Sequence, residues 1–496
     1  MSASSAVLTS ASNPFVCTDV GKSIIVAKAG GSSGFAPLSA TISSFQSAGQ
    51  VTLSATATLA VSGAGAIYGT DDTTAIQNAV NAAVTYASNN FGAAEVLFAG
   101  GIYCIAGAPV SGGVSVTNGA LNLGNAQIQL PYIDTASGRQ KVSLSLRGLA
   151  GHPSPPPHWN QTTLVTDGAV LACMRTDGAY NATYGPTSVI GSPVDTGGLF
   201  SNLRAAIDNL SILLPYESTY CGVDLFGCGQ MDLGRLSVTC MATPPSGTPW
   251  PQYENWGPAN VAQASNMFAL RSPALGNNDQ SALYDLTAYG MACGVMFTDH
   301  LSASNVRCVY CINAIQAIAS ASNDSHLCYF ANLSAELCQT WIAANNSGGY
   351  ACNAPTPLIV NAHFEHVAGG SVGVYDPGNK LYGQVSFENL GGIYSGYTFN
   401  LLTGAANIKL VLLHNGPGPV SSPAAAPGNN VAWPNYYYRD AEITLSVSAG
   451  SLSALTINGV AQTVPAGTTF YRFTLPSGQS YTPTYTGTLT HTVTLF

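Results

Sequence analysis

The segment 68–105 has the clearest pattern of hydrophobic and polar positions in the chain. Its apolar residues first recur at spacings of three and four, the period of one helix face, so we expect an α-helix over residues 72–87. Asp71 and Asp72 stand where carboxylates accept from the free N–H groups of a first turn, and we interpret them as helix caps rather than as a catalytic pair. From 96 to 102 the period changes to two, which predicts a half-buried strand.

The remainder of the chain is dominated by short apolar runs typical of strands. A polar residue with an Asx side chain introduces such a run at intervals of 20, 27, 29 and 28 residues. The residues in this series are Asp285, Asn305, Asn332, Asn361 and Asn389. A repeat of twenty-odd residues that varies by loop insertion is typical of the coils of a solenoid.

The helix-to-strand segment also carries a family resemblance. G-T-D-D-T-x-A-I-Q-x-A-V followed by E-V-L-F-x-x-G-x-Y resembles the opening segment of the pectate-lyase-like superfamily, which includes many phage tailspikes and polysaccharide-degrading enzymes. The sequence departs from that pattern at 98–101, where the family usually has Pro before Gly. A-L-R-S-P-A-L-G-N-N-D-Q-S and A-E-L-C-Q further resemble minor tail proteins of phages. The resemblance implies a right-handed parallel β-helix whose first helix covers the open end of the coil stack.

The expected fold class is therefore all-β, with a right-handed parallel β-helix over residues 67–420 and an N-terminal capping α-helix. Residues 1–66 read as a small β segment that resembles segments ahead of β-helices in phage tail proteins, and this resemblance implies attachment to other tail or baseplate proteins. Residues 435–496 alternate Thr, Val, Leu and Ser around turn residues, which predicts a small β-sandwich-like domain. In tailspikes such modules trimerise or bind receptor; an ordinary folded domain is the alternative.

Composition excludes several functional classes. The 496 residues include 14 basic and 23 acidic side chains, a net charge of −9, and only 7% are charged. An acidic chain without a Lys/Arg stripe is unsuited to nucleic acid, and no apolar run reaches the ~18 residues of a membrane helix. The N-terminus lacks a basic region followed by an apolar core, so we expect no secretory signal.

The 12 cysteines argue for reduced, buried thiols rather than a disulfide framework, because many stand inside apolar runs. Cys308 and Cys311 form a single C-x-x-C. On one strand, positions three apart point to opposite faces, so we expect neither a metal site nor a cofactor.

Candidate chemistry comes from aligning the coils at their Asx residues. Leu333 and Ala335 then fall on the buried side and Glu336 on the outer side, where it is matched by Glu365 in the next coil. Equivalent positions in a parallel stack lie about 4.8 Å apart, close to the ~5–5.5 Å carboxylate separation of retaining glycosidases. Repulsion between the two would raise one pKa, as a general acid requires.

Arg307 and His363 align on the same outer face, where Arg307 could neutralise an acidic sugar and His363 completes the candidate catalytic set with the two glutamates. The alternative is a satisfied surface ladder with no catalytic role, and an alignment error of one residue would exchange the two faces. Asp299 and His300 echo only the last two residues of a pectate-lyase motif and are candidates for lining a groove, with satisfied turn residues as the alternative.

A Pro-rich insertion at 243–258 carries Trp250, Tyr253 and Trp256. Exposed rings on a loop suit stacking on sugars, and they suit a contact between subunits equally well.

The function expected from these features is that of a phage tail spike or tail fibre, a homotrimer in the virion tail that binds and cleaves a cell-surface polysaccharide. One alternative is a structural or receptor-binding tail protein without turnover. A second alternative is a secreted polysaccharide lyase.

Overall fold

The structure is a computed structural model. It describes residues 1–31, 36–89, 92–115, 121–133, 142–149, 168–178, 180–181, 185–195, 201–215, 220–241, 268–273, 281–297, 300–318, 328–336, 338, 340–345, 357–364, 372–375, 383–388, 400–403, 408–413, 426–435, 440–476 and 479–495.

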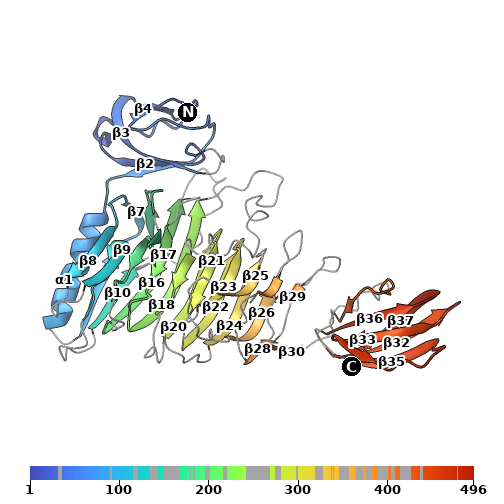
Figure 1. The fold of residues 1–496 in the computed structure, drawn as a ribbon. Coiled ribbons are helices and arrows are strands. Elements are labelled where there is room, and N and C mark those ends of the chain that lie inside the picture. Colours follow the sequence, from blue (N-terminus) through green and yellow to red (C-terminus); the bar gives the residue numbers. More distant parts are fainter. Residues whose placement is uncertain are drawn as a thin grey trace.

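Two large sheets form the body of the molecule (Figure 1). The twelve-stranded sheet contains β6 (Ala93–Phe98), β7 (Gly101–Ile105), β10 (Val142–Gly148), β11 (Ala169–Cys173), β16 (Leu203–Pro215), β18 (Gln230–Met241), β20 (Ser281–Tyr289), β22 (Leu301–Val309), β24 (Cys328–Glu336), β26 (Pro357–Phe364), β28 (Gly383–Glu388) and β30 (Ile408–Leu413). The eleven-stranded sheet contains β8 (Val110–Ser115), β9 (Leu121–Gln129), β14 (Ser188–Gly191), β15 (Val194–Asp195), β17 (Cys221–Asp224), β19 (Phe268–Arg271), β21 (Cys293–Phe297), β23 (Asn313–Ile318), β25 (Thr340–Asn345), β27 (Val372–Tyr375) and β29 (Asn400–Thr403).

The chain alternates between these sheets, so each strand lies beside the equivalent strand of the next coil. Neighbours in the twelve-stranded sheet pair in parallel, as do those in the other sheet apart from β8 and β15, which pair antiparallel to β9. This arrangement confirms the predicted all-β fold class and the parallel β-helix.

The interior is filled by every second residue of these strands. In β24 the predicted alternation holds, because Leu333 and Ala335 are buried while Asn332 is exposed and Glu336 partly exposed. Register places Leu333 beside Val306 of the preceding coil, so apolar side chains stack in columns. One hydrophobic cluster runs from the helix to β27, and its burial is the main term that stabilises the coil stack.

A left-handed residue bends each long strand of the twelve-stranded sheet near its middle. These residues are Asn209 (φ 59°), Arg235 (φ 45°), Asp285 (φ 54°), Asn305 (φ 53°) and Asn332 (φ 54°). They lie at equivalent positions of successive strands, so the Asx repeat read from the sequence marks one column. The same register places Asn361 next, whereas Asn389 lies outside the described residues. Asn tolerates this conformation better than most residues, which explains its recurrence.

Helix α1 (Thr73–Asn89) closes the first coil, with Ile76 and Val80 turned into the core. Asp71 Oδ1 accepts from the backbone N–H groups of Thr73 and Ala106, both at 3.0 Å. Partial burial raises the pKa of Asp71, but these hydrogen bonds outweigh it and hold the pKa below its usual value. The aspartate is therefore an ionised cap, as expected.

The helix also covers an open sheet edge through one side chain. Gln77 Oε1 accepts from the Gln129 N–H at 2.7 Å, and Gln77 Nε2 donates to the Gln129 carbonyl at 2.9 Å. The Gln77 side chain thus satisfies the backbone N–H and carbonyl of Gln129, which a further strand beside β9 would otherwise pair with.

The N-terminal domain is one antiparallel sheet in the order β1 (Val7–Thr9), β4 (Gln50–Leu53), β3 (Leu38–Ser47), β2 (Ser23–Val26), β5 (Ala66–Gly69), with the short 3-10 helix η1 (Cys17–Asp19). It rests on the start of the β-helix (Figure 1). Ile25 and Ile67 pack with Val170 and Leu213, so this contact is apolar and buried.

The C-terminal domain contains two antiparallel sheets around one core that includes Trp433, Ile443 and Leu455. One sheet has the order β31 (Trp433–Pro434), β36 (Ser480–Tyr485), β33 (Leu452–Ile457), β34 (Val460–Gln462), and the other β35 (Phe470–Leu475), β32 (Ala441–Ser448), β37 (Thr488–Leu495). The predicted sandwich-like domain is confirmed. Residues 180–186 add a small pair, β12 (Tyr180–Asn181) and β13 (Gly185–Pro186).

One expectation about the cysteines is wrong. Cys308 and Cys311 do not point to opposite faces, because β22 ends at Val309 and the chain turns at Tyr310 (φ 51°). Both side chains are buried in the main core.

Candidate functional site

The outward face of the twelve-stranded sheet between β6 and β26 is called here the outer wall. Positions one and three residues before each left-handed residue, and two and four after it, point outward, while those between them point into the core. Because register is kept from strand to strand, each outward position forms a column with neighbours about 4.8 Å apart. Residues remote in sequence thereby become neighbours on this wall.

Glu336 at the end of β24 is held by two side chains from adjacent positions of the wall. Arg307 of β22 donates from Nε to Oε1 and from Nη2 to Oε2, both at 2.8 Å. Ser334 Oγ donates to Oε1 at 3.0 Å. The glutamate side chain is 21% exposed, so it remains reachable from solvent. We call Arg307, Ser334, Glu336 and His363 the Glu336 centre.

The surroundings keep this carboxyl ionised. Hydrogen bonds from the Arg307 guanidinium lower the pKa of Glu336, partial burial opposes them, and the Ser334 hydroxyl lowers it further. This direction is opposite to the raised pKa of a general acid and suits a nucleophile or base. Arg307 is directed at this carboxylate rather than held apart as a separate cationic site.

His363 lies in the column predicted for it. Register places Arg307 beside Ser334 and Ser334 beside His363, which is exposed on β26. The charge of His363 contributes to lowering the pKa of Glu336, so the two side chains are electrostatically coupled. Glu365 lies outside the described residues, one residue beyond the end of β26.

The other candidates are not brought to this centre. His300 is half-buried just before β22, at the opposite end of that strand from Arg307. Asp299 and the three aromatic residues Trp250, Tyr253 and Trp256 lie outside the described residues. Their binding roles stay predictions.

A second set of charges on the outer wall was missed by the sequence reasoning. Glu95 of β6 accepts from Arg147 of β10 at 2.7 and 2.9 Å, and Asp232 accepts from Arg204 at 2.8 Å. The Arg147 hydrogen bonds lower the pKa of Glu95. These pairs join residues 28 or 52 positions apart, so only strand register could have revealed them.

Asp208 accepts hydrogen bonds from two further side chains of the wall. Arg235 donates to both of its oxygens, and the Tyr284 hydroxyl donates to Oδ1 at 3.4 Å. Tyr284 reaches Asp208 across Gly234, where a Cβ would stand 1.9 Å from the tyrosine ring. The glycine is therefore required by the ring that lies over it.

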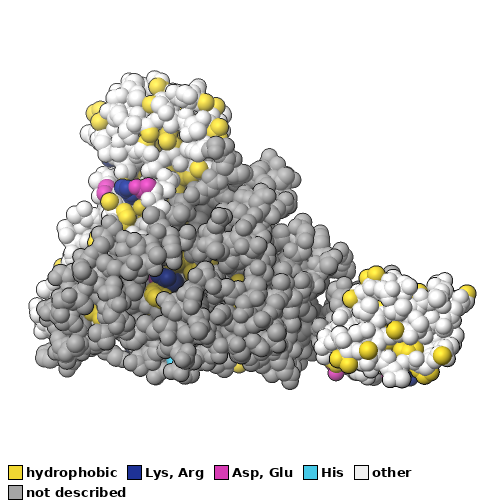
Figure 2. Space-filling view, viewed as in Figure 1, with side chains coloured by type: hydrophobic (Ala, Val, Ile, Leu, Met, Phe, Trp, Pro, Cys, Tyr) yellow, Lys and Arg dark blue, Asp and Glu magenta, His cyan; other side chains and the backbone are white. Residues whose placement is uncertain are grey.

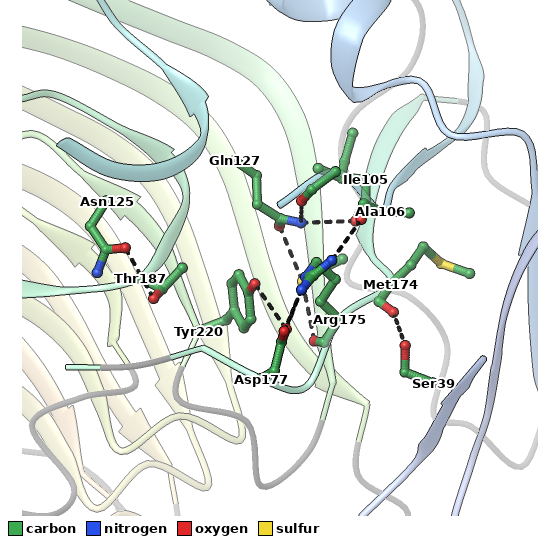
Figure 3. Close-up of polar contacts among 12 residues, drawn as sticks. Ser39, Ile105, Ala106, Asn125, Gln127, Met174, Arg175, Asp177, Thr187 and Tyr220 are labelled. Atoms are coloured by element: carbon green, nitrogen blue, oxygen red, sulfur yellow. Dashed lines mark hydrogen bonds and ion pairs between the residues drawn. The ribbon is translucent and has the colours of Figure 1, made fainter. Parts of the chain in front are cut away.

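A third polar cluster lies in the first coils of the β-helix, next to the N-terminal domain (Figure 3). Gln127 donates to two backbone carbonyls at the end of β7, at 3.1 and 3.0 Å, and accepts from Cys173 Sγ at 3.3 Å. Arg175 pairs with Asp177 through two hydrogen bonds and lowers its pKa, and Tyr220 donates to the same carboxylate. This cluster ties the first coils together, and its hydrogen bonds have a structural role.

Among the described side chains visible in Figure 2, one group of charged atoms lies between the N-terminal domain and the β-helix. In the described parts of the chain, no group of three or more His, Cys, Asp or Glu side chains is placed to hold a metal ion. No helix within those parts is long and apolar enough to cross a membrane.

No protein-family model matches the sequence, and no curated protein matches it. Solved structures do. A Pantoea stewartii protein, WceF, described as a glycan biofilm modifying enzyme with a bacteriophage tailspike-like parallel β-helix fold, is 10% identical with a TM-score of 0.31; the match covers 84% of this chain and 59% of that protein. The chain thus spans less than two thirds of that protein's length.

Two further matches have the same low identity. Tailspike protein 2 of bacteriophage CBA120, in its enzymatically active domain, is 11% identical with a TM-score of 0.27, covering 100% of this chain and 86% of that one. The A-module of a mannuronan C-5 epimerase from Azotobacter vinelandii is 12% identical with a TM-score of 0.20, covering 70% and 96%. The strand pairing of this structure, rather than these matches, confirms the parallel β-helix.

Proposed function

We propose that this chain is a phage tail spike or tail fibre protein that binds a cell-surface polysaccharide on its outer wall and hydrolyses it at the Glu336 centre. The observation that carries the proposal is the convergence of Arg307, Ser334, Glu336 and His363 from three coils. A polar, solvent-facing wall of repeated strands suits a polymer with repeated units.

Glu336 has the properties of the nucleophile in a retaining mechanism. Its pKa is lowered, so it is ionised at neutral pH. A carboxylate has about four acceptor positions. Oε1 uses two of them for Arg307 and Ser334, whereas Oε2 receives only the Arg307 Nη2 bond among the contacts above. In the proposed step, Oε2 attacks the anomeric carbon.

Glu365 is the proposed acid/base, because it follows His363 by two residues in the sequence, as Glu336 follows Ser334, and the Asx alignment predicts that the two carboxylates match. It would protonate the leaving glycosidic oxygen, and then take a proton from the water that releases the sugar from Glu336. His363, two residues before Glu365 in the sequence, would orient it.

Incubation of the purified protein with host capsule or exopolysaccharide tests this function. We expect oligosaccharides to be released, and Glu336→Gln and Glu365→Gln each to reduce release by at least about a hundredfold. Asp232→Asn, on the same wall but outside the centre, is the matched control and should retain activity. Full activity in both glutamine variants would remove the proposed centre, and unsaturated products absorbing ultraviolet light would indicate a lyase instead.

A second candidate is glycan binding without turnover. It is favoured by the resemblance of the Arg307–Glu336 pair to two other ion pairs of the wall, Arg147–Glu95 and Arg204–Asp232. Binding to the polysaccharide without any released product, over a range of pH and divalent ions, would support it.

The proposal includes assembly. We infer that residues 1–66 attach the protein to other tail or baseplate components and that the chain is a homotrimer in the virion tail, as the tailspike resemblance implies. Light scattering of the purified full chain should give three times the 50.9 kDa mass of one chain. A monomer at micromolar concentration would contradict this part alone.

A further inference from the structure

Two aromatic side chains stand out on the outer wall. Tyr284 of β20 is 39% exposed and Tyr329 of β24 is 38% exposed, and they are the exposed aromatic residues in the described parts of β16 to β26. Both occupy outward positions, whereas their strand neighbours Leu283 and Phe330 point into the core.

The wall between the two rings is lined by small side chains. Register places Ser304 and Ala331 in the column of Tyr284, and Ala282 and Ser302 in the column of Tyr329. Tyr284 leans over Gly234, away from β22, so its ring leaves these positions uncovered. The result is a shallow floor two strand spacings wide, roughly 10 Å, with an aromatic ring at each end.

Amide groups form one border of this floor. Asn332 Nδ2 donates to Asn305 Oδ1, and Asn305 Nδ2 donates to Asp285 Oδ1, both at 2.9 Å. The two asparagines are exposed and lie between the floor and the Glu336 centre, two residues before Arg307 and Ser334 respectively. A polysaccharide bound on the floor would therefore pass over the side-chain amides of Asn305 and Asn332 to reach Glu336.

The charges of the wall decide the class of polymer. The described strands from β6 to β26 carry five carboxylates at or beside the outward positions, Glu95, Asp208, Asp232, Asp285 and Glu336, four guanidinium groups, Arg147, Arg204, Arg235 and Arg307, and the exposed imidazole of His363. Each of these guanidinium groups is paired with one of the carboxylates. An anionic polymer would meet no surplus of positive charge there.

We propose that the floor bounded by Tyr284 and Tyr329 is a subsite for an uncharged polysaccharide. The C–H faces of its sugar rings stack on the two tyrosines, and its hydroxyls exchange hydrogen bonds with Ser302, Ser304 and the asparagine amides. This inference rests on the proposed function, since it supplies the binding surface that leads to Glu336. The alternative, in which Arg307 neutralises an acidic sugar, stays a prediction that the same test distinguishes.

The test measures affinity of the full chain in gels containing neutral polysaccharides (dextran, galactomannan, mannan) or acidic ones (alginate, polygalacturonate). We expect retardation by a neutral polymer that changes little between low and high salt, because screening affects only charged contacts. Tyr329→Ala and Tyr284→Ala should each weaken binding roughly three- to tenfold, as expected for loss of one stacked ring. Tyr329→Phe should bind like the wild type.

The matched control is Tyr86→Ala, which removes an exposed tyrosine from α1 and should leave binding unchanged. Salt-sensitive binding to acidic polymers alone would overturn the uncharged class. Unchanged affinity in both alanine variants, with normal release of oligosaccharides, would overturn the floor but leave the proposed function standing. Failure of the wild type to bind any polysaccharide would overturn both.

Discussion

At the scale of single residues, the most informative side chain is Glu336, because its partners fix its protonation state. Two parallel hydrogen bonds from Arg307 hold the carboxylate, and such bidentate pairs are the stronger kind of ion pair. A lowered pKa suits the nucleophile of the proposed glycosidase pair, so our proposal assigns the acid/base role to Glu365. Geometry alone would not have made this distinction.

Removal of the guanidinium should shift the pH dependence of cleavage. Arg307 lowers the pKa of Glu336 from its ordinary 4.5, so the carboxylate stays ionised to lower pH. The stabilisation that the Arg307–Glu336 pair gives to the folded state is lost only as pH falls through this lowered pKa. In Arg307→Gln the pKa should rise, and the acidic limb of the kcat/KM profile should move to higher pH. Arg204→Gln, which removes a similarly exposed guanidinium from Asp232, should leave that limb in place. An unmoved limb in Arg307→Gln would mean that Glu336 does not control the rate.

Sequence reasoning succeeded where an alternating or repeated pattern marked the positions, and failed where a contact occurs once and no pattern repeats. The period of two around Leu333 and Ala335 gave the buried side of β24, and the Asx repeat gave the register that aligns Arg307 with Ser334 and His363. The contact of Tyr284 with Asp208 joins residues 76 positions apart across a glycine in a third strand. No local pattern contains that information.

At the scale of elements, the left-handed column bends the strands and also links them. Asn332 has φ 54° and donates its amide to Asn305 of the preceding coil. Alanine removes the side-chain amide and is strained at this φ, whereas glycine removes the amide without that strain. Asn332→Ala should therefore lower the free energy of unfolding by about 2 kcal/mol and Asn332→Gly by about 1 kcal/mol. Urea titration followed by circular dichroism measures both, and equal losses would show that backbone strain is not involved.

The capping helix gives a second prediction at this scale. Gln77→Ala removes both hydrogen bonds to Gln129. The free energy needed to open the end of β9 should therefore fall by roughly 1–3 kcal/mol. Hydrogen exchange at the Gln129 amide should accelerate accordingly, while exchange in β22 stays slow. Asn81→Ala is the control, because it removes only the side-chain contact between Gln77 and Asn81 at 3.0 Å. Faster exchange in that control would assign the effect to helix fraying.

At the scale of the whole molecule, one core runs through the coils and a smaller apolar contact joins the N-terminal domain to them. The repeat of Asx residues predicts the coil stack, since each coil resembles the next. It says nothing of the contact between Ile25 and Leu213, because that surface occurs once and has no repeating signal. Repetition is therefore what made the β-helix predictable.

The distribution of thiols tests this architecture. Among the ten described cysteines, Cys17 is exposed and nine are buried. Burial raises the pKa of Cys104 to about 11 and those of Cys173 and Cys228 to about 12. Since the thiolate is the reactive form, the buried thiols should resist an aqueous disulfide reagent.

With Cys240 and Cys352 replaced by serine, because they lie outside the residues whose exposure is described, the native chain should release one equivalent of thionitrobenzoate rapidly. Cys17→Ser should abolish that phase. The other nine thiols should react only when the coils open, and their rate should follow the unfolding rate in urea rather than the reagent concentration. If several of the nine reacted rapidly in the absence of urea, the coils that contain them would not be closely packed, and the columns that assemble the Glu336 centre would lose their support.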